Sequence, residues 1–162
     1  MQILKIKANQ TLNLRNTILR PGLDLAQCEY VGDNDDSTHH LGCVVDNELV
    51  GIVSIYERSN SAVHSGCGFQ IRAMATCDTV RGKGMGLSLL KAAEQTAFNS
   101  GAKYIWANAR ASAIGFYKKA GYQIGHEEFQ IEGVGAHFVV CLPRTQKKTG
   151  VTARANDGSM PY

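Results

Sequence analysis

Apolar and β-branched residues gather in short runs separated by polar or glycine-rich turns, and each run predicts a strand. Two of these runs, 41–45 and 49–56, are joined by the short polar turn 46–48 and therefore predict a hairpin. The other predicted strands cover residues 3–7, 69–76, 104–107, 122–131 and 136–142.

Helical periodicity fills three of the intervals between these strands. Residues 12–20 carry an apolar stripe, with Thr11 placed to cap the start and Pro21 to stop the helix. The second helix, 87–98, ends before a glycine at position 101 that suits a C-terminal cap, and the third covers 112–119. One face of the second helix combines Gly86, Leu89, Leu90, Ala93 and Ala97. The order of elements predicts a mixed α/β fold with helices on the faces of one sheet.

Charge divides the chain into a neutral body and a basic tail. The chain has 162 residues and a net charge of +3, and the whole excess lies in the tail. We therefore expect one domain over 1–143 and a polar, flexible tail over 144–162. A neutral body favours no nucleic-acid partner, and the chain lacks an apolar run long enough to span a membrane.

The five scattered cysteines favour reduced thiols, and the first residues lack the pattern of a signal peptide. We therefore expect a cytoplasmic protein. His39-His40 and His64-x-x-Cys67 are fragments of metal-binding patterns without the second pair that structural zinc needs, so we expect no metal. Arg15 and Arg20 are expected to be surface charges, with contact to an anionic group of the substrate as the alternative, and the acidic loop 33–36 is expected to be solvated.

A glycine-rich turn, residues 81–86, separates the strand 69–76 from the second helix. It reads Arg-Gly-Lys-Gly-Met-Gly. Such a turn directs backbone N–H groups and the positive end of the helix dipole at one place, which suits phosphate oxygens. The turn lacks the Ser or Thr after Lys83 that a Walker loop requires, and it does not match the spacing of a dinucleotide fingerprint.

The spacing Arg81-x-x-Gly84-x-Gly86 resembles the acyl-coenzyme A pyrophosphate loop of the GNAT superfamily of N-acyltransferases. Asn108 and the run Phe116-Tyr117-x-x-x-Gly121-Tyr122 resemble the later part of that family's coenzyme site. The resemblance covers roughly residues 3–142, and the N-terminal half also resembles uncharacterised bacterial members of the family. It implies a mostly antiparallel, twisted sheet of about seven strands with a central splay for acyl-CoA.

The resemblance also implies where the donor, acetyl-CoA, is held. Backbone and side chains of the glycine turn would bind its pyrophosphate, and the preceding strand end would pair with the pantetheine arm. An N–H at that strand end would polarise the thioester carbonyl. The implied cofactor-binding residues are Met74, Ala75, Thr76, Arg81, Gly82, Lys83, Gly84, Met85, Gly86, Asn108 and Tyr117.

Tyr117 matches the tyrosine that points at the sulfur in the family, which implies a general acid for the departing thiolate. The base is less defined, because Gln70 and Arg72 occupy the strand where many relatives carry an acid. His40, His137 and Glu57 are the candidate bases, and a chain of water molecules is the alternative.

The expected activity is transfer of an acyl group, most simply acetyl, from acyl-CoA to a primary amine within a ternary complex. The alternatives are a non-catalytic acyl-CoA-binding or regulatory module on the same fold and, more remotely, a nucleotide-binding domain. The loops expected to border the acceptor, 33–40 and 59–68, contain no motif that identifies the amine. A homodimer is expected by analogy with the family alone.

Overall fold

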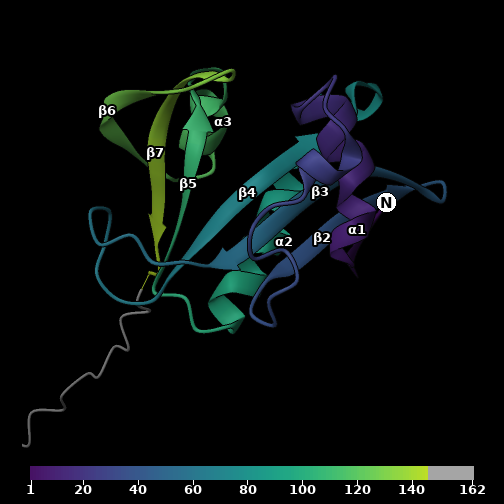
Figure 1. Ribbon diagram of the computed structural model, residues 1–162. Helices are drawn as coiled ribbons and strands as arrows, with labels where there is room; N and C mark the ends of the chain where they lie inside the picture. The colour runs from purple at the N-terminus through teal and green to yellow at the C-terminus, as the bar shows by residue number, and fades with distance from the viewer. Residues whose placement is uncertain (146–162) are drawn as a thin grey trace, which may run out of the picture.

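A computed structural model describes residues 1–145, which form one seven-stranded sheet with helices on both faces (Figure 1). The strand order is β1-β2-β3-β4-β5-β7-β6. Only β4 and β5 run parallel, so the expected mixed and mostly antiparallel sheet is confirmed. The strands are β1 (Gln2–Ile6), β2 (His39–Val45), β3 (Glu48–Glu57), β4 (Gly68–Thr76), β5 (Tyr104–Arg110), β6 (Gln123–Ile131) and β7 (Gly135–Pro143). Most of the predicted tail, 146–162, lies outside the described residues.

Three α-helices and several short turns connect the strands. The helices are α1 (Ala8–Leu14), α2 (Met85–Asn99) and α3 (Ile114–Lys119), and α1 continues as the π-helical turn η1 (Arg15–Leu19). In Figure 1, α1 lies in front of the sheet formed by β1 to β4, α2 lies behind it, and α3 lies beside β5. The apolar face predicted for α2 is confirmed, since Leu89, Leu90, Ala93 and Ala97 are fully buried.

The sheet divides between β4 and β5. These strands pair at three positions only, Gly68 with Tyr104, Phe69 with Ile105 and Gln70 with Trp106, and then diverge. Beyond that point the sheet opens as a V between β4 and the arm formed by β5, β7 and β6 (Figure 1). The expected central splay is therefore confirmed.

A β-bulge in β4 coincides with the opening. The register with β3 shifts between Ile52 and Ser54, and Ala73 takes the left-handed φ of 51° that non-glycine residues rarely adopt. A bulge bends its strand and increases the local twist, which turns the end of β4 away from β5.

The first helix begins earlier than the pattern predicted. Gln10 Oε1 accepts a hydrogen bond from the Lys7 N–H at 2.8 Å, so the helix starts at Ala8 rather than at residue 12. Thr11 is not a cap, because it is fully buried inside the helix and donates its hydroxyl to Ala8 O. Gln10 occupies the third helical position, from which a glutamine side chain can accept from the N–H of the residue that caps the helix.

Arg15 and Asp33 are a buried ion pair, which corrects the expectation of solvent-exposed charges. Arg15 Nη1 and Nη2 donate to the two Asp33 carboxylate oxygens at 2.6 and 2.9 Å, and Arg15 has no exposed surface. The same carboxylate accepts from the Tyr30 N–H and from Tyr56 Oη. Burial alone would raise the pKa of Asp33, but these hydrogen bonds and the charge of Arg15 lower it below its usual value.

Replacing Asp33 with Asn is expected to destabilise the fold strongly. The substitution removes the only negative charge paired with the buried Arg15 in residues 1–145. Breaking one partner of a buried pair leaves an uncompensated charge and lowers the free energy of unfolding by about 3–5 kcal/mol. Urea denaturation followed by circular dichroism measures this change.

Asp36→Asn is the matched control, because Asp36 lies in the same loop and is exposed. Its effect is expected to stay within about 0.5 kcal/mol.

The stability that Asp33 contributes depends on pH. Because the folded pKa of Asp33 is depressed, its contribution to the free energy of unfolding is complete above about pH 3.9 and is lost as pH falls through the folded pKa. Asp33→Asn should lack this part of the acid-induced loss, and equal stability of the two variants would contradict the assignment.

Candidate active site

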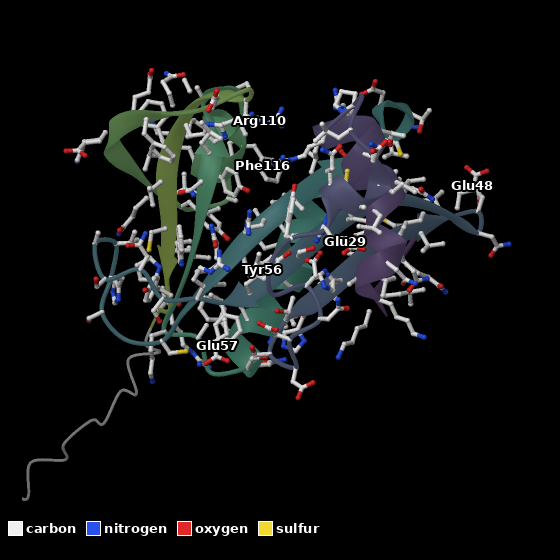
Figure 2. All side chains as sticks on the ribbon, in the orientation of Figure 1. Glu29, Glu48, Tyr56, Glu57, Arg110 and Phe116 are labelled. Carbon is white, nitrogen blue, oxygen red and sulfur yellow. The ribbon has the colours of Figure 1, made fainter. Side chains whose placement is uncertain are left out.

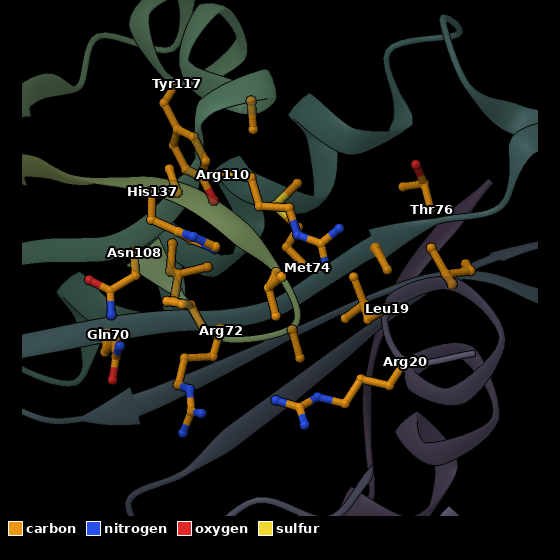
Figure 3. Close-up of a pocket in the computed structure, with 18 of the residues that line it drawn as sticks. Leu19, Arg20, Gln70, Arg72, Met74, Thr76, Asn108, Arg110, Tyr117 and His137 are labelled. Atoms are coloured by element: carbon orange, nitrogen blue, oxygen red, sulfur yellow. The ribbon is translucent and has the colours of Figure 1, made fainter. Parts of the chain in front are cut away.

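The opening between β4 and β5 holds a cleft of about 450 Å³. Its walls come from η1 and the following residue, from the loop at Tyr30, from both diverging strands, from α3 and from the β6–β7 turn. Figure 3 shows the labelled side chains of Tyr117, His137, Asn108, Arg110, Arg72 and Arg20 gathered around this space. One cleft therefore collects residues that lie more than 100 positions apart in the sequence.

The glycine turn leaves its backbone open to a ligand. Gly82 and Gly84 adopt φ values of 74° and 78°, and an added Cβ at either position would meet no atom within 4 Å. Gly84 is the N-cap of α2, so the N–H groups of the first helical turn have no partner within the helix. The turn thus presents unpaired donors and the positive end of a 15-residue helix to one exposed face.

The edge of β4 that faces the cleft carries free backbone groups. The Cys77 N–H donates to Val50 O of β3 at 2.8 Å. Backbone groups alternate in direction along a strand, so those of Thr76 and Met74 face the opposite edge, where β5 has departed. Ala75 pairs with Ile52 and faces β3. Met74 and Thr76 can therefore bind an extended ligand as an added strand would.

Tyr117 lies on α3 and reaches the cleft between two other aromatic rings. Its ring meets Phe116 and Tyr122 edge-on at centroid distances of 5.3 and 5.2 Å. Its side chain is 7% exposed, it lines the cleft, and no residue within 1–145 forms a hydrogen bond with its hydroxyl. Burial raises the pKa of Tyr117 to about 12, so the phenol keeps its proton at neutral pH.

Of the three candidate bases, only His137 lines the cleft. It lies on β7 opposite Arg110 of β5, and its Nδ1 is 2.7 Å from Gly135 O. A carbonyl oxygen only accepts, so Nδ1 carries the hydrogen and the neutral ring keeps its lone pair on Nε2. Figure 3 shows this ring between Tyr117 and Asn108.

His40 and Glu57 lie elsewhere. Both ring nitrogens of the buried His40 are engaged, Nδ1 with Ser54 Oγ and Nε2 with Asp33 O, each at 2.8 Å. Glu57 is exposed at the end of β3 where β4 begins, and Figure 2 shows it at the opposite end of the sheet from Arg110. Neither His40 nor Glu57 lines the cleft.

The remaining predicted residues divide between the cleft and the glycine turn. Asn108 lines the cleft from β5, and Met74, Ala75 and Thr76 line it from β4. Arg81 reaches the cleft and also pairs with Asp78 at 2.8 Å, with both side chains exposed. Lys83 and Met85 belong to the turn but do not line the cleft.

Sequence reasoning missed the polar wall opposite Tyr117. Arg20, Tyr30, Gln70, Arg72 and Arg110 all line the cleft. Arg72 and Gln70 alternate with buried residues on β4, which places them toward one face, but spacing alone did not say that this face lines a cleft. The sequence offered contact with an anionic substrate group only as an alternative for Arg20, and it did not connect Arg20 or Tyr30 with β4, because only tertiary contacts bring η1 and the following loop to that strand.

Two kinds of feature are absent from the part of the chain that the structure describes. Residues 1–145 contain no group of three or more His, Cys, Asp or Glu side chains placed to hold a metal ion. No helix in the same residues has the length and apolar character needed to cross a membrane.

Comparisons with known proteins agree with this geometry. The sequence model of the acetyltransferase (GNAT) family matches residues 8–122. The chain is 33% identical over 140 residues to the uncharacterized N-acetyltransferase YitI of Bacillus subtilis, an alignment that covers 86% of this chain and 94% of that protein. The chain therefore belongs to the GNAT family of acetyltransferases, which confirms the expected class of enzyme and its co-substrate, acetyl-CoA.

Solved structures show the same fold at low sequence identity. A crystal structure of aminoglycoside 6′-N-acetyltransferase complexed with coenzyme A has a TM-score of 0.70 and 15% identity, covering 90% of this chain and all of that one. A putative N-acetyltransferase from Lactobacillus plantarum has a TM-score of 0.69 and 19% identity, covering 88% of this chain and 97% of that one. These structures support the fold assignment, and the chemistry must be argued from the site itself.

Proposed function

We propose that this protein transfers an acetyl group from acetyl-CoA directly to a primary amine within a ternary complex. The observation that carries the proposal is one cleft that Arg81 borders at the open glycine turn, that follows the free edge of β4, and that reaches a tyrosine hydroxyl without a hydrogen-bond partner in residues 1–145. None of the residues lining the cleft is a cysteine or a serine, which favours direct transfer over an acyl-enzyme.

The chain's own groups divide the binding of the donor between them. The N–H groups of residues 82–86 bind the pyrophosphate, and Arg81 and Lys83 add charge-assisted contacts. The backbone of Met74 and Thr76 pairs with the amides of the pantetheine arm. Asn108 borders the same path from β5. When bound, acetyl-CoA supplies an activated thioester.

Two side chains move the protons. His137 Nε2 removes a proton from the ammonium group of the acceptor, either directly or through one water molecule, because an alkylammonium has a pKa near 10.4. The Met74 N–H donates to the carbonyl oxygen where negative charge develops. As the C–N bond forms and the C–S bond breaks, Tyr117 Oη donates its proton to the sulfur, and the second proton released by the nitrogen returns to the phenol through water.

The alternative, a non-catalytic acyl-CoA-binding module, derives from Gln70 and Arg72 standing where many relatives carry an acid. His137 answers this objection, because it provides a base from β7 on the other side of the cleft.

All five cysteines are free thiols, which supports the proposed cytoplasmic location. A homodimer stays a prediction from family analogy.

Gly84→Val is expected to weaken binding of coenzyme A at least tenfold. A β-branched residue at a φ of 78° distorts the turn and puts a side chain on the face that would approach the pyrophosphate. Loss of one hydrogen bond to a charged group is worth about 1.5–3 kcal/mol, which corresponds to tenfold or more. Titration calorimetry with coenzyme A measures the change.

Gly101→Val provides the matched control at the other end of α2. Gly101 has a φ of 98° and equally open surroundings, so a valine there causes similar backbone strain. It follows the C-terminal end of α2, whereas the glycine turn precedes the N-terminal end. This variant should bind coenzyme A like the unaltered protein. Wild-type protein that gives no heat with coenzyme A at millimolar concentration would refute the proposed function.

Tyr117→Phe is expected to lower kcat about a hundredfold or more with little change in affinity for acetyl-CoA. The substitution keeps the ring packing against Phe116 and Tyr122 but removes the proton that the thiolate needs. Thiol release measured at saturating acetyl-CoA gives kcat. Tyr122→Phe, which removes a hydroxyl outside the cleft, is the control, and equal turnover of both variants would exclude Tyr117 from the mechanism.

His137→Gln is expected to lower kcat by about a hundredfold or more, because no other base lines the cleft within residues 1–145. Added imidazole should restore part of the rate, since a small base can enter the space left by the ring. His126→Gln is the control, because His126 is an exposed histidine of β6. A His137→Gln variant as active as this control would favour transfer through water alone.

A further inference from the structure

The cleft carries a strong imbalance of charge. Four arginines, Arg20, Arg72, Arg81 and Arg110, line it, and none of its lining residues is an aspartate or glutamate. Arg81 belongs to the glycine turn and pairs with Asp78. The other three guanidinium groups have no carboxylate partner anywhere in residues 1–145. A cleft of this sign concentrates anions and repels polycations.

Arg20 and Arg72 act on the same part of the cleft. Both guanidinium groups lie over the ring of Tyr30, at 5.6 and 4.6 Å from its centroid. Figure 3 shows the two side chains reaching toward each other, Arg20 from the end of η1 and Arg72 from β4. Both side chains are half-buried, so their charges are less screened than at an open surface.

The buried ion pair fixes the ring that these two arginines share. The Tyr30 N–H donates to Asp33 Oδ2 at 2.8 Å, and Arg15 lies over the ring at 4.3 Å. Tyr56, anchored by the same carboxylate, provides a second ring 5.6 Å from Arg72. The pair of guanidinium groups is therefore held in place before any ligand arrives, which lowers the entropy lost on binding.

Arg20 and Arg72 lie on the side of the cleft away from the glycine turn. Arg72 precedes the bulge at Ala73, whereas Met74, Thr76 and the glycine turn follow it. Arg20 directly follows η1, which continues α1 on the sheet face opposite to α2 (Figure 1). The glycine turn lies at the start of α2, which covers the other face of the sheet. The two arginines therefore face the acceptor.

We propose that the acceptor is a primary amine that also carries a carboxylate or phosphate group, which Arg20 and Arg72 bind. This inference rests on the proposed function and narrows its substrate class. Two guanidinium groups present planar sets of donors that match carboxylate or phosphate oxygens. Binding the anion would set the amine of the same molecule at a fixed distance from His137.

The test compares matched amines that differ in the anionic group. β-Alanine is paired with β-alaninamide, and O-phosphoethanolamine with ethanolamine, while spermidine represents a polycation. Thiol release gives kcat/KM for each amine at saturating acetyl-CoA, and calorimetry gives binding of the same amines to protein loaded with coenzyme A. At least one anionic amine should exceed its neutral partner about 10- to 100-fold. Which anionic amine prevails distinguishes a carboxylate site from a phosphate site.

Variants locate the anion-binding group. Arg20→Gln should raise KM for the preferred anionic amine about tenfold or more, and leave KM for acetyl-CoA and the neutral amines unchanged. Arg72→Gln should act in the same direction, and its thermal stability is measured beside it because Arg72 also packs on Tyr30 and Tyr56. Arg144→Gln makes the same charge change outside the cleft and should have no effect.

Preference for a neutral amine or spermidine, or absence of both turnover and binding with every anionic amine, would overturn the inference. So would an Arg20→Gln variant that loses acetyl-CoA affinity instead of amine affinity. Protein that binds coenzyme A and acetylates only neutral amines would refute this inference but keep the proposed function. Failure to bind coenzyme A at all would refute the proposed function itself.

Discussion

The structure depends on the early separation of two parallel strands. β4 and β5 pair at three positions and then part, which leaves backbone donors and acceptors of β4 without a strand partner. An unpaired edge inside a sheet is unfavourable unless something binds it, so a fold that keeps one open provides a site for an extended ligand. The bulge at Ala73 maintains the opening, and the left-handed conformation of a non-glycine residue there costs about 1–2 kcal/mol. The cleft, the exposed glycine turn and the reach of Tyr117 all follow from this separation.

A buried ion pair fixes the wall of the cleft that carries Tyr30, Arg20 and Arg72. Arg15, Asp33 and Tyr56 come from η1, a loop and β3, and their hydrogen bonds join three segments that no secondary structure connects. Such a pair adds little net stability compared with apolar packing, but it is strongly destabilising to break. Its structural value here is to fix Tyr30, and through that ring Arg20 and Arg72. The buried ion pair therefore determines where the guanidinium groups of Arg20 and Arg72 lie in the cleft.

The two sides of the cleft perform different tasks. The side after the bulge offers backbone N–H groups and a helix N-terminus, which bind phosphate whatever side chains are present. The side before the bulge offers arginine side chains, which we propose select the amine. Tyr117 and His137 stand on α3 and β7, in the arm beyond the opening, so in the proposed mechanism the proton transfers come from one arm and most of the binding from the other. In the proposed mechanism this division lets one fold retain its donor while acceptors vary.

The sequence by itself determined the order of strands and helices, the glycine turn and the candidate acid Tyr117, because these depend on periodicity, turn chemistry and a local motif. It also determined the family through two motifs in the correct order. Tertiary structure alone decided that Arg15 and Asp33 are buried, that His137 rather than His40 or Glu57 lines the cleft, and that Arg20 and Arg72 share the ring of Tyr30. Residues in each of these sets are distant in sequence, and a local pattern describes the face on which a side chain lies but not what packs against that face.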